Sequence, residues 1–168
     1  MKSLFKTDPD IASLVLRLVL GAVFFPHGAQ KVLGWFGGHG FAGTMGFFTG
    51  QMHIPALFAF LAIAAEFAGS LALIAGLFTR VAAFGIAATM AVAVAMVHWQ
   101  HGFFMNWSGA QKGEGIEYHL LAVAIALALV IKGGGKWALD ALIARKLNAK
   151  FAATTSQARI EPALAEAH

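Results

Sequence analysis

Two ionisable side chains lie inside long apolar runs of this sequence. Arg17 lies in the first run, and Glu66 lies at the middle of the second. A charged side chain in a bilayer core costs about 2.5–3.5 kcal/mol on insertion scales, so such residues face partners within the protein and often mark function. The chemistry open to these two is an ion pair that fixes helices together, or a proton or quinone site.

The positions of Arg17 and Glu66 predict that they pair. At 1.5 Å per residue, Arg17 lies about 9 Å above the inner end of its run, and Glu66 lies about 18 Å below the outer end of its own. In a hydrocarbon core about 30 Å thick, their depths differ by only about 3 Å. We therefore expect an Arg17–Glu66 ion pair, which would offset part of both desolvation penalties.

Histidines gather at the outer ends of the apolar runs. His27 and His98 lie at similar heights above the inner ends of their runs, and His98 and His101 share a helix face if that helix continues. Lys31 follows His27 by one helical turn, and Glu117 enters at the same level from the last run. We expect these five side chains to line an outer ligand-binding cavity.

Histidines and a carboxylate can bind zinc, copper or non-haem iron, and a histidine pair can ligate haem. His98, His101 and His27 are therefore candidate metal ligands, although their spacing matches no recognised motif. The simpler interpretation is a set of interfacial or hydrogen-bonded histidines, whose apolar rings and polar tips suit the headgroup level. A quinone or a metal ion on the outer side remains open.

Composition explains why these groups lie in a membrane. Of 168 residues, 59% are hydrophobic and 12% are charged, whereas a soluble domain carries about 25% charged residues. The positive charges flank apolar runs and form no basic groove, so no nucleic-acid partner is expected. Cysteine is absent, which excludes disulfides, thiolate-bound iron–sulfur clusters and dithiol redox relays within this chain.

The apolar runs predict an all-α integral membrane protein with four transmembrane helices. A span needs about 20 residues, so the last run depends on Lys132 and Trp137 at its flank. Nine Lys and Arg residues flank the inner ends, against Lys31 and Lys112 outside, which places both termini in the cytoplasm. The predicted spans are 11–28, 54–78, 81–98 and 117–131.

The chain divides into three predicted parts. Residues 1–135 form the four-helix membrane bundle, with the Gly- and Phe-rich segment 28–53 lying in the interface or folding back over it. Residues 136–151 place leucine and isoleucine on one helical face and form a cytoplasmic amphipathic helix on the anionic inner leaflet. Residues 152–168 form a flexible tail.

An ordered set of motifs spans about residues 11–142. Its pieces are Arg17, His27-Gly28 with Lys31, Glu66 with Gly69, Leu77-Phe78-Thr79-Arg80 after Gly76, Glu117, and Gly133-x-Gly135-x-x-x-Leu139-Asp140. This set resembles the DoxX family of small four-helix bacterial membrane proteins. One departure is Gly134, where the family often has proline.

The resemblance implies a multi-pass protein of the bacterial cytoplasmic membrane, linked to respiratory or redox systems. We expect a non-catalytic accessory subunit of a quinone-linked oxidoreductase complex, with the lipid bilayer and redox proteins as partners. Two alternatives remain open: a non-enzymatic binding or transport module for a metal ion or small solute, and an assembly scaffold. No catalytic residue is transferred by the resemblance.

Overall fold

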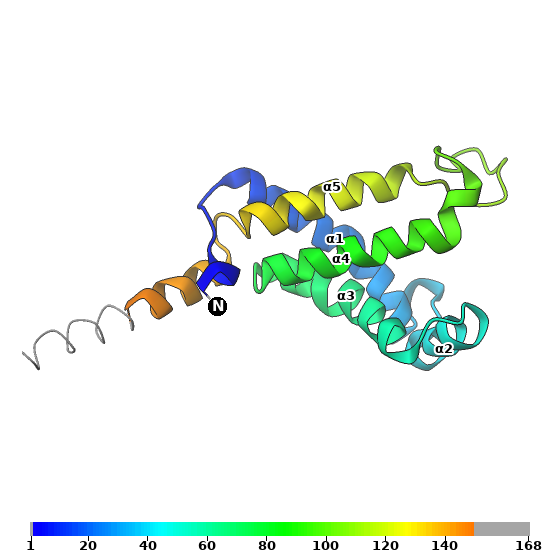
Figure 1. Ribbon diagram of the computed structural model, residues 1–168, viewed down its shortest axis with the longest axis horizontal. Helices are drawn as coiled ribbons and strands as arrows, with labels where there is room; N and C mark the ends of the chain where they lie inside the picture. Colours follow the sequence, from blue (N-terminus) through cyan, green and yellow to red (C-terminus); the bar gives the residue numbers. More distant parts are fainter. Residues whose placement is uncertain (1, 150–168) are drawn as a thin grey trace, which may run out of the picture.

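Residues 2–149 are described by the computed structural model, and the regular structure within them is entirely helical. This confirms the all-α prediction. Figure 1 shows the long helices side by side, with α2 at the end opposite to the first residues of the chain. The long helices are α1 (Ile11–Leu33), α3 (Ala56–Ala75), α4 (Thr79–Ala93) and α5 (Glu117–Lys132).

Short helices connect the long ones. Between α1 and α3 lie η2 (Trp35–Gly37), α2 (Gly40–Gly46) and the π-helix η3 (Phe47–Gln51). The axis of α4 continues through η4 (Val94–His98) and η5 (Trp99–His101). A further helix covers residues 139–149, so it begins three residues later than predicted, and the predicted tail at 152–168 lies outside the described residues.

Each long helix packs against two neighbours. α1 contacts α3 and α5, and α4 contacts the same two helices from the other side. Small residues such as Ala59, Ala83 and Ala126 are fully buried between them, which allows close approach of helices in a membrane. The outer surfaces are apolar, with side chains such as Phe58 and Phe84 more than half exposed. Lipid is the natural neighbour of these surfaces.

Three helices are long and apolar enough to cross a membrane within residues 2–149: Ile11–Leu33, Ala56–Ala75 and Thr79–His101. The first is longer than predicted, and the second is shorter because Pro55 precedes it and Gly76 ends it with a left-handed backbone. α5, the predicted fourth span, has 16 residues, fewer than the roughly 20 that a span needs. Its crossing of the membrane remains a prediction.

The first span begins at a capped residue outside the membrane segment. Asp10 accepts hydrogen bonds from the Ser13 hydroxyl at 2.7 Å and from the Ser13 backbone N–H at 2.9 Å. These two donors favour the carboxylate and hold the pKa of Asp10 below its usual value. The cap fixes the start of α1.

The start of α4 is capped from a distant part of the chain. The carboxylate of Asp140 accepts hydrogen bonds from Phe78 N at 2.7 Å and Thr79 N at 2.9 Å. Phe78, the residue before α4, has no side-chain oxygen of its own to do this. Asp140 N donates in turn to Gly76 O at 2.9 Å. The segment after α5 is therefore tied to the α3–α4 turn.

We expect Asp140→Ala to destabilise the protein by about 2–3 kcal/mol, because two N–H groups lose a charged acceptor in a buried place. Thermal unfolding in detergent or lipid nanodiscs measures this loss. Asp8→Ala is the matched control, since Asp8 is exposed and its side chain caps no helix. Equal melting temperatures for both variants would contradict the capping role.

Candidate functional site

Arg17 is buried and directed toward the C-terminal end of α3. We call this end of the bundle the inner end and the opposite end the outer end, after the predicted topology. Its Nε donates to Gly134 O at 2.9 Å, and its Nη2 lies 3.3 Å from Lys136 O. Its Nη1 donates to Leu73 O at 3.0 Å and Ile74 O at 2.5 Å. These two carbonyls belong to the last turn of α3, where helix carbonyls have no intrahelical partner. The guanidinium thus caps a helix C-terminus.

The predicted Arg17–Glu66 ion pair is therefore wrong. Glu66 lies about 10 Å along α3 from Leu73, toward the outer end. It forms a salt bridge with Lys31 at 2.5 Å between Nζ and Oε2. Four backbone carbonyls satisfy the Arg17 guanidinium in place of a carboxylate.

The Lys31–Glu66 pair joins the outer half of α1 to the middle of α3. Glu66 is 5% exposed, whereas the Lys31 side chain is 23% exposed. Lys31 Nζ also lies 3.5 Å from the carbonyl oxygen of His27, one turn earlier. One end of the pair is buried in protein and the other reaches a more open region.

Glycine on α1 explains how Lys31 reaches Glu66. A Cβ atom at Gly28 would lie 2.5 Å from Phe67 Cα and 2.7 Å from the Glu66 carbonyl carbon. A Cβ at Gly21 would lie 2.9 Å from Ser70 O. α1 and α3 therefore touch backbone to backbone, as small residues permit in membrane helices.

We expect Gly28→Ala to destabilise the protein by about 2–3 kcal/mol, because the new methyl group must push two backbones apart. The same displacement should loosen the Lys31–Glu66 salt bridge. Gly46→Ala is the matched control: Gly46 is helical and a Cβ there meets nothing within 4 Å. Melting temperatures of the two variants test this, and a tolerated alanine at Gly28 would contradict the close crossing.

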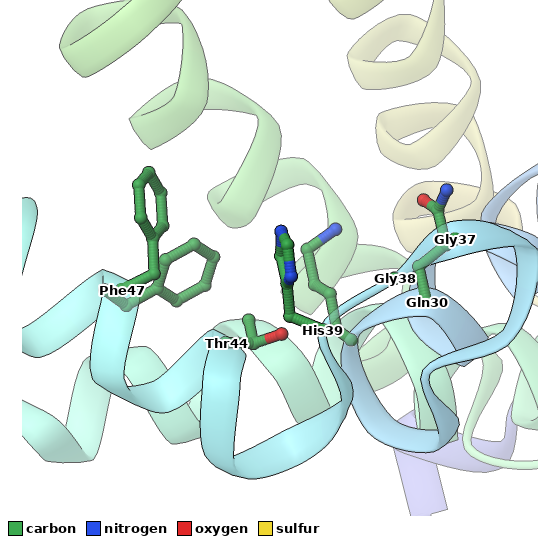
Figure 2. Close-up of a pocket in the computed structure, with 8 residues that line it drawn as sticks. Gln30, Gly37, Gly38, His39, Thr44 and Phe47 are labelled. Atoms are coloured by element: carbon green, nitrogen blue, oxygen red, sulfur yellow. The ribbon is translucent and has the colours of Figure 1, made fainter.

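A cavity of about 300 Å³ lies beside the pair, between the end of α1 and the α2–η3 segment. Figure 2 shows His39 and Thr44 between Phe47 and Gln30. The loop stays on α1 because Gln30 Nε2 donates to Phe36 O at 3.2 Å. The residues that line the cavity are Gln30, Lys31, Gly37, Gly38, His39, Thr44, Phe47 and Phe48.

A second polar group lies on α5 and η4. The rings of His98 and His119 are 4.0 Å apart between centroids, and His98 Nδ1 lies 2.8 Å from Glu114 O. Tyr118 stacks on the buried ring of Phe24 at 6.3 Å. Neither Tyr118 nor His119 is among the five residues predicted to line the outer cavity, although Tyr118 is the single tyrosine of the chain.

The predicted outer residues are thus divided between places. Lys31 lines the cavity. His27 lies one turn before Lys31 on α1, does not line the cavity and is exposed. His98 pairs with His119 instead, and Glu117 accepts a hydrogen bond from Met105 N at 3.0 Å. His101 packs against Gly113 in the loop before α5. One cavity lined by all five is not what the structure shows.

The candidate metal ligands are not assembled either. Within residues 2–149, no three His, Cys, Asp or Glu side chains lie close enough together to hold a metal ion. The three candidates His98, His101 and His27 therefore do not form a three-ligand site. His98 and His119 form an aromatic pair in which His98 already has a carbonyl partner.

Comparison with known proteins identifies the family. The DoxX family matches residues 12–99. The chain belongs to the DoxX family. It is 31% identical over 134 residues to the Bacillus subtilis (strain 168) protein named "Putative oxidoreductase CatD", covering 80% of this chain and 88% of that protein. No solved structure matches the chain.

Some of the DoxX motif pieces that are separate in the sequence, but not those around Lys31 and Glu66, meet at the inner end. Arg80 donates to the carbonyls of Val130 and Ile131, the last turn of α5, and to Lys6 O. Added Cβ atoms on the glycines after α5 would meet the Thr79 hydroxyl or the backbone of Asp10 at 2.6 Å. We call this set the inner network: Arg17, Gly76, Thr79, Arg80, Gly133, Gly134, Gly135 and Asp140.

The inner network and the outer site have different roles. The charged groups of the inner network bind backbone groups at helix ends, whereas the buried hydroxyl of Thr79 has no hydrogen-bond partner among the described residues. At the outer site, Lys31 both binds Glu66 and lines a cavity. Of the two places in this DoxX protein, the outer site is the one where a charged side chain lines a cavity.

Proposed function

We propose that this protein is the membrane subunit of a quinone-linked redox assembly in the bacterial cytoplasmic membrane, and that it holds a quinone headgroup in the outer cavity. The observation that carries the proposal is Lys31, which is held by buried Glu66 and lines a cavity that also contains Phe47 and Phe48. Membership of the DoxX family and a relative named as an oxidoreductase support it.

The proposed arrangement has four spans with both termini in the cytoplasm. Lys6 and Arg80 meet at the same end of the molecule, and Lys136 lies beside Arg17 there. Lys132 ends α5 at this end. Lys31 lies toward the other end, near α2. Such an asymmetry follows the positive-inside rule and supports α5 as the fourth span.

The lining of the cavity suits a quinone ring. Its volume of about 300 Å³ is at the small end of ligand pockets, which fits a headgroup better than a larger cofactor. Lys31 can donate a hydrogen bond to a ring carbonyl, and the Thr44 hydroxyl and the Gln30 amide offer further polar partners. Phe47 and Phe48 offer aromatic faces on which a planar ring can stack.

A bound quinone would supply two-electron, two-proton chemistry, while the chain's own residues bind and orient the ring. Glu66 holds the Lys31 ammonium group at the cavity. The sequence contains no cysteine, so its residues offer no thiolate ligands for an iron–sulfur cluster. We therefore assign electron transfer to the redox centre of a partner protein, which makes this chain an accessory subunit.

Quinone titration of the purified protein in nanodiscs tests the proposal. Quenching of tryptophan fluorescence by a short-chain benzoquinone or naphthoquinone reports binding, since Trp35 begins the η2 segment beside the cavity. We expect Lys31→Met to weaken binding about tenfold, the loss of one charged hydrogen bond. Lys112→Met, in the other outer loop, should bind like the unchanged protein.

Isolation from native membranes tests the accessory role. Redox subunits should co-purify in stoichiometric amounts with the protein. If quinone binding is absent or unaffected by Lys31→Met, the cavity assignment is wrong. If nothing co-purifies, the accessory role is wrong, and the transport and scaffold alternatives gain support.

A further inference from the structure

Two buried polar atoms on the first turn of α5 lack a hydrogen-bond partner among the described residues. They are the Tyr118 hydroxyl oxygen and His119 Nδ1. His119 is 6% exposed. Inside a membrane, unpaired polar groups are strongly disfavoured, and buried polar atoms of this kind bind ordered water or a ligand. Both atoms belong to groups that can accept and donate a proton.

The first contact of this pair leads to the outer surface. The His119 ring lies against the His98 ring at 4.0 Å. His98 Nδ1 lies 2.8 Å from the backbone oxygen of Glu114, which is an exposed residue of the loop before α5. A neutral imidazole accepts a proton on one nitrogen and donates one from the other. No hydrogen bond joins the two rings among the described residues, so a proton would pass between them, and between His98 and the solvent beside the loop, through bridging water.

The second contact leads toward the outer site. Tyr118 is adjacent to His119 with ring centroids 5.5 Å apart. The buried Phe24 ring packs against both Tyr118 and His27. The carbonyl oxygen of His27 lies 3.5 Å from Lys31 Nζ. Tyr118 therefore lies between His119 and the part of α1 that carries His27 and Lys31.

Every element packed around this region contributes an ionisable group. α1 contributes His27 and Lys31, and α3 contributes Glu66. η4 contributes His98, and α5 contributes Tyr118 and His119. The carboxylate of Glu117 is directed elsewhere, to Met105 N, and that of Glu114 to Asn106 N.

We propose that Tyr118, His119 and His98, joined by bound water, form a proton-exchange path between the Lys31–Glu66 pair and the outer surface at Glu114. Glu66 accepts or releases one proton at a time, and the imidazoles carry that proton to or from the outer loop. The path ends at Glu66, because the next charged group along α3 is Arg17, whose Nη1 donates to the backbone carbonyls of Leu73 and Ile74. It is a half-channel, not a transmembrane leak.

The use of this path rests on the proposed function. A quinol in the cavity that gives two electrons to the redox centre of a partner protein must also lose two protons. Glu66 would take them in turn and pass them to Tyr118 and the histidines, and the reverse direction would serve quinone reduction. The existence of the path does not require the quinone, so the two proposals can fail separately.

A rapid pH jump on the quinone-free protein in nanodiscs, followed by infrared spectroscopy, tests the path. The carboxyl band of Glu66 is assigned by its loss in Glu66→Gln. We expect Tyr118→Phe, which removes one oxygen and keeps the ring on Phe24, to slow proton exchange at Glu66 by about tenfold or more. His119→Gln should slow it similarly. His53→Asn is the control, an exposed outer histidine with φ 55° that asparagine tolerates.

The contrary outcomes are distinct. Exchange at the unchanged rate in Tyr118→Phe and His119→Gln would overturn the path, as would a Glu66 band that does not respond to the jump. An unpaired hydroxyl with only a packing role predicts that Tyr118→Phe is as stable as the parent or more so, with no kinetic change. If Tyr118→Phe and His119→Gln slow proton exchange but Lys31→Met leaves the quinone affinity unchanged, the path is kept and the proposed function is rejected.

Discussion

Replacing Arg17 by alanine is expected to destabilise the protein by about 3–5 kcal/mol. The guanidinium binds carbonyls at the end of α3 and in the Gly134–Lys136 segment. Leu73 O would keep its bond from Gly76 N, but alanine would remove the Arg17 donor from all four carbonyls in a buried, low-dielectric place and would loosen the segment that carries Asp140. Thermal or denaturant unfolding in nanodiscs measures the loss.

Two comparisons identify the cause of that loss. Arg17→Lys keeps the charge but replaces a planar set of donors by one ammonium group, so it should recover only part of the stability. Combining Arg17→Ala with Glu66→Gln should give additive effects, within about 0.5 kcal/mol, because the two residues share no contact. A coupling energy well above that would mean that Arg17 and Glu66 interact after all.

Lys31→Met is expected to destabilise the protein by about 3–5 kcal/mol as well, because it leaves Glu66 buried and charged without a partner. The double variant Lys31→Met with Glu66→Gln removes both charges. Replacing a whole buried pair costs much less than breaking it, so the double variant should recover most of the stability. Denaturant titration of the four proteins in one double-mutant cycle gives the coupling energy directly.

The control for the Lys31 cycle is a second cycle that combines Lys112→Met with Glu66→Gln. Lys112 is a lysine of the other outer loop. Lys112 is exposed, and surface lysines contribute little to stability. Additive effects in the Lys31 cycle, as expected for Lys112, would contradict the salt bridge as a stabilising contact. Additive effects would also mean that the salt bridge with Glu66 does not hold Lys31 at the cavity.

The sequence predicted the long helices well and their contacts poorly. Long apolar runs such as that of α1 identify membrane helices because length and hydropathy are local properties. A depth estimate for Arg17 and Glu66 gives height along a helix but not the direction in which a side chain points. It also leaves out backbone carbonyls, and these are what Arg17 binds.

The residues of the outer site are brought together by helix packing and local backbone structure, which the periodicity of the sequence does not reveal. Lys31 was assigned to the outer cavity, but its partner was not, because the close crossing at Gly28 becomes visible only when α1 and α3 are packed. Phe47 and Phe48 reach the cavity through a π-helix, which has no recognisable sequence pattern here. Tyr118 stood next to the selected Glu117, yet α5 turns the two side chains in different directions.

Photoaffinity labelling with an azidoquinone tests the central claim, a quinone headgroup held beside Lys31, most directly. The protein is labelled in nanodiscs, digested and mapped by mass spectrometry. The account predicts label within residues 30–48, which line the cavity, reduced by excess unlabelled quinone and by Lys31→Met but not by Lys112→Met. Label confined to the lipid-facing residues of α3 and α4, and insensitive to competition, would contradict it.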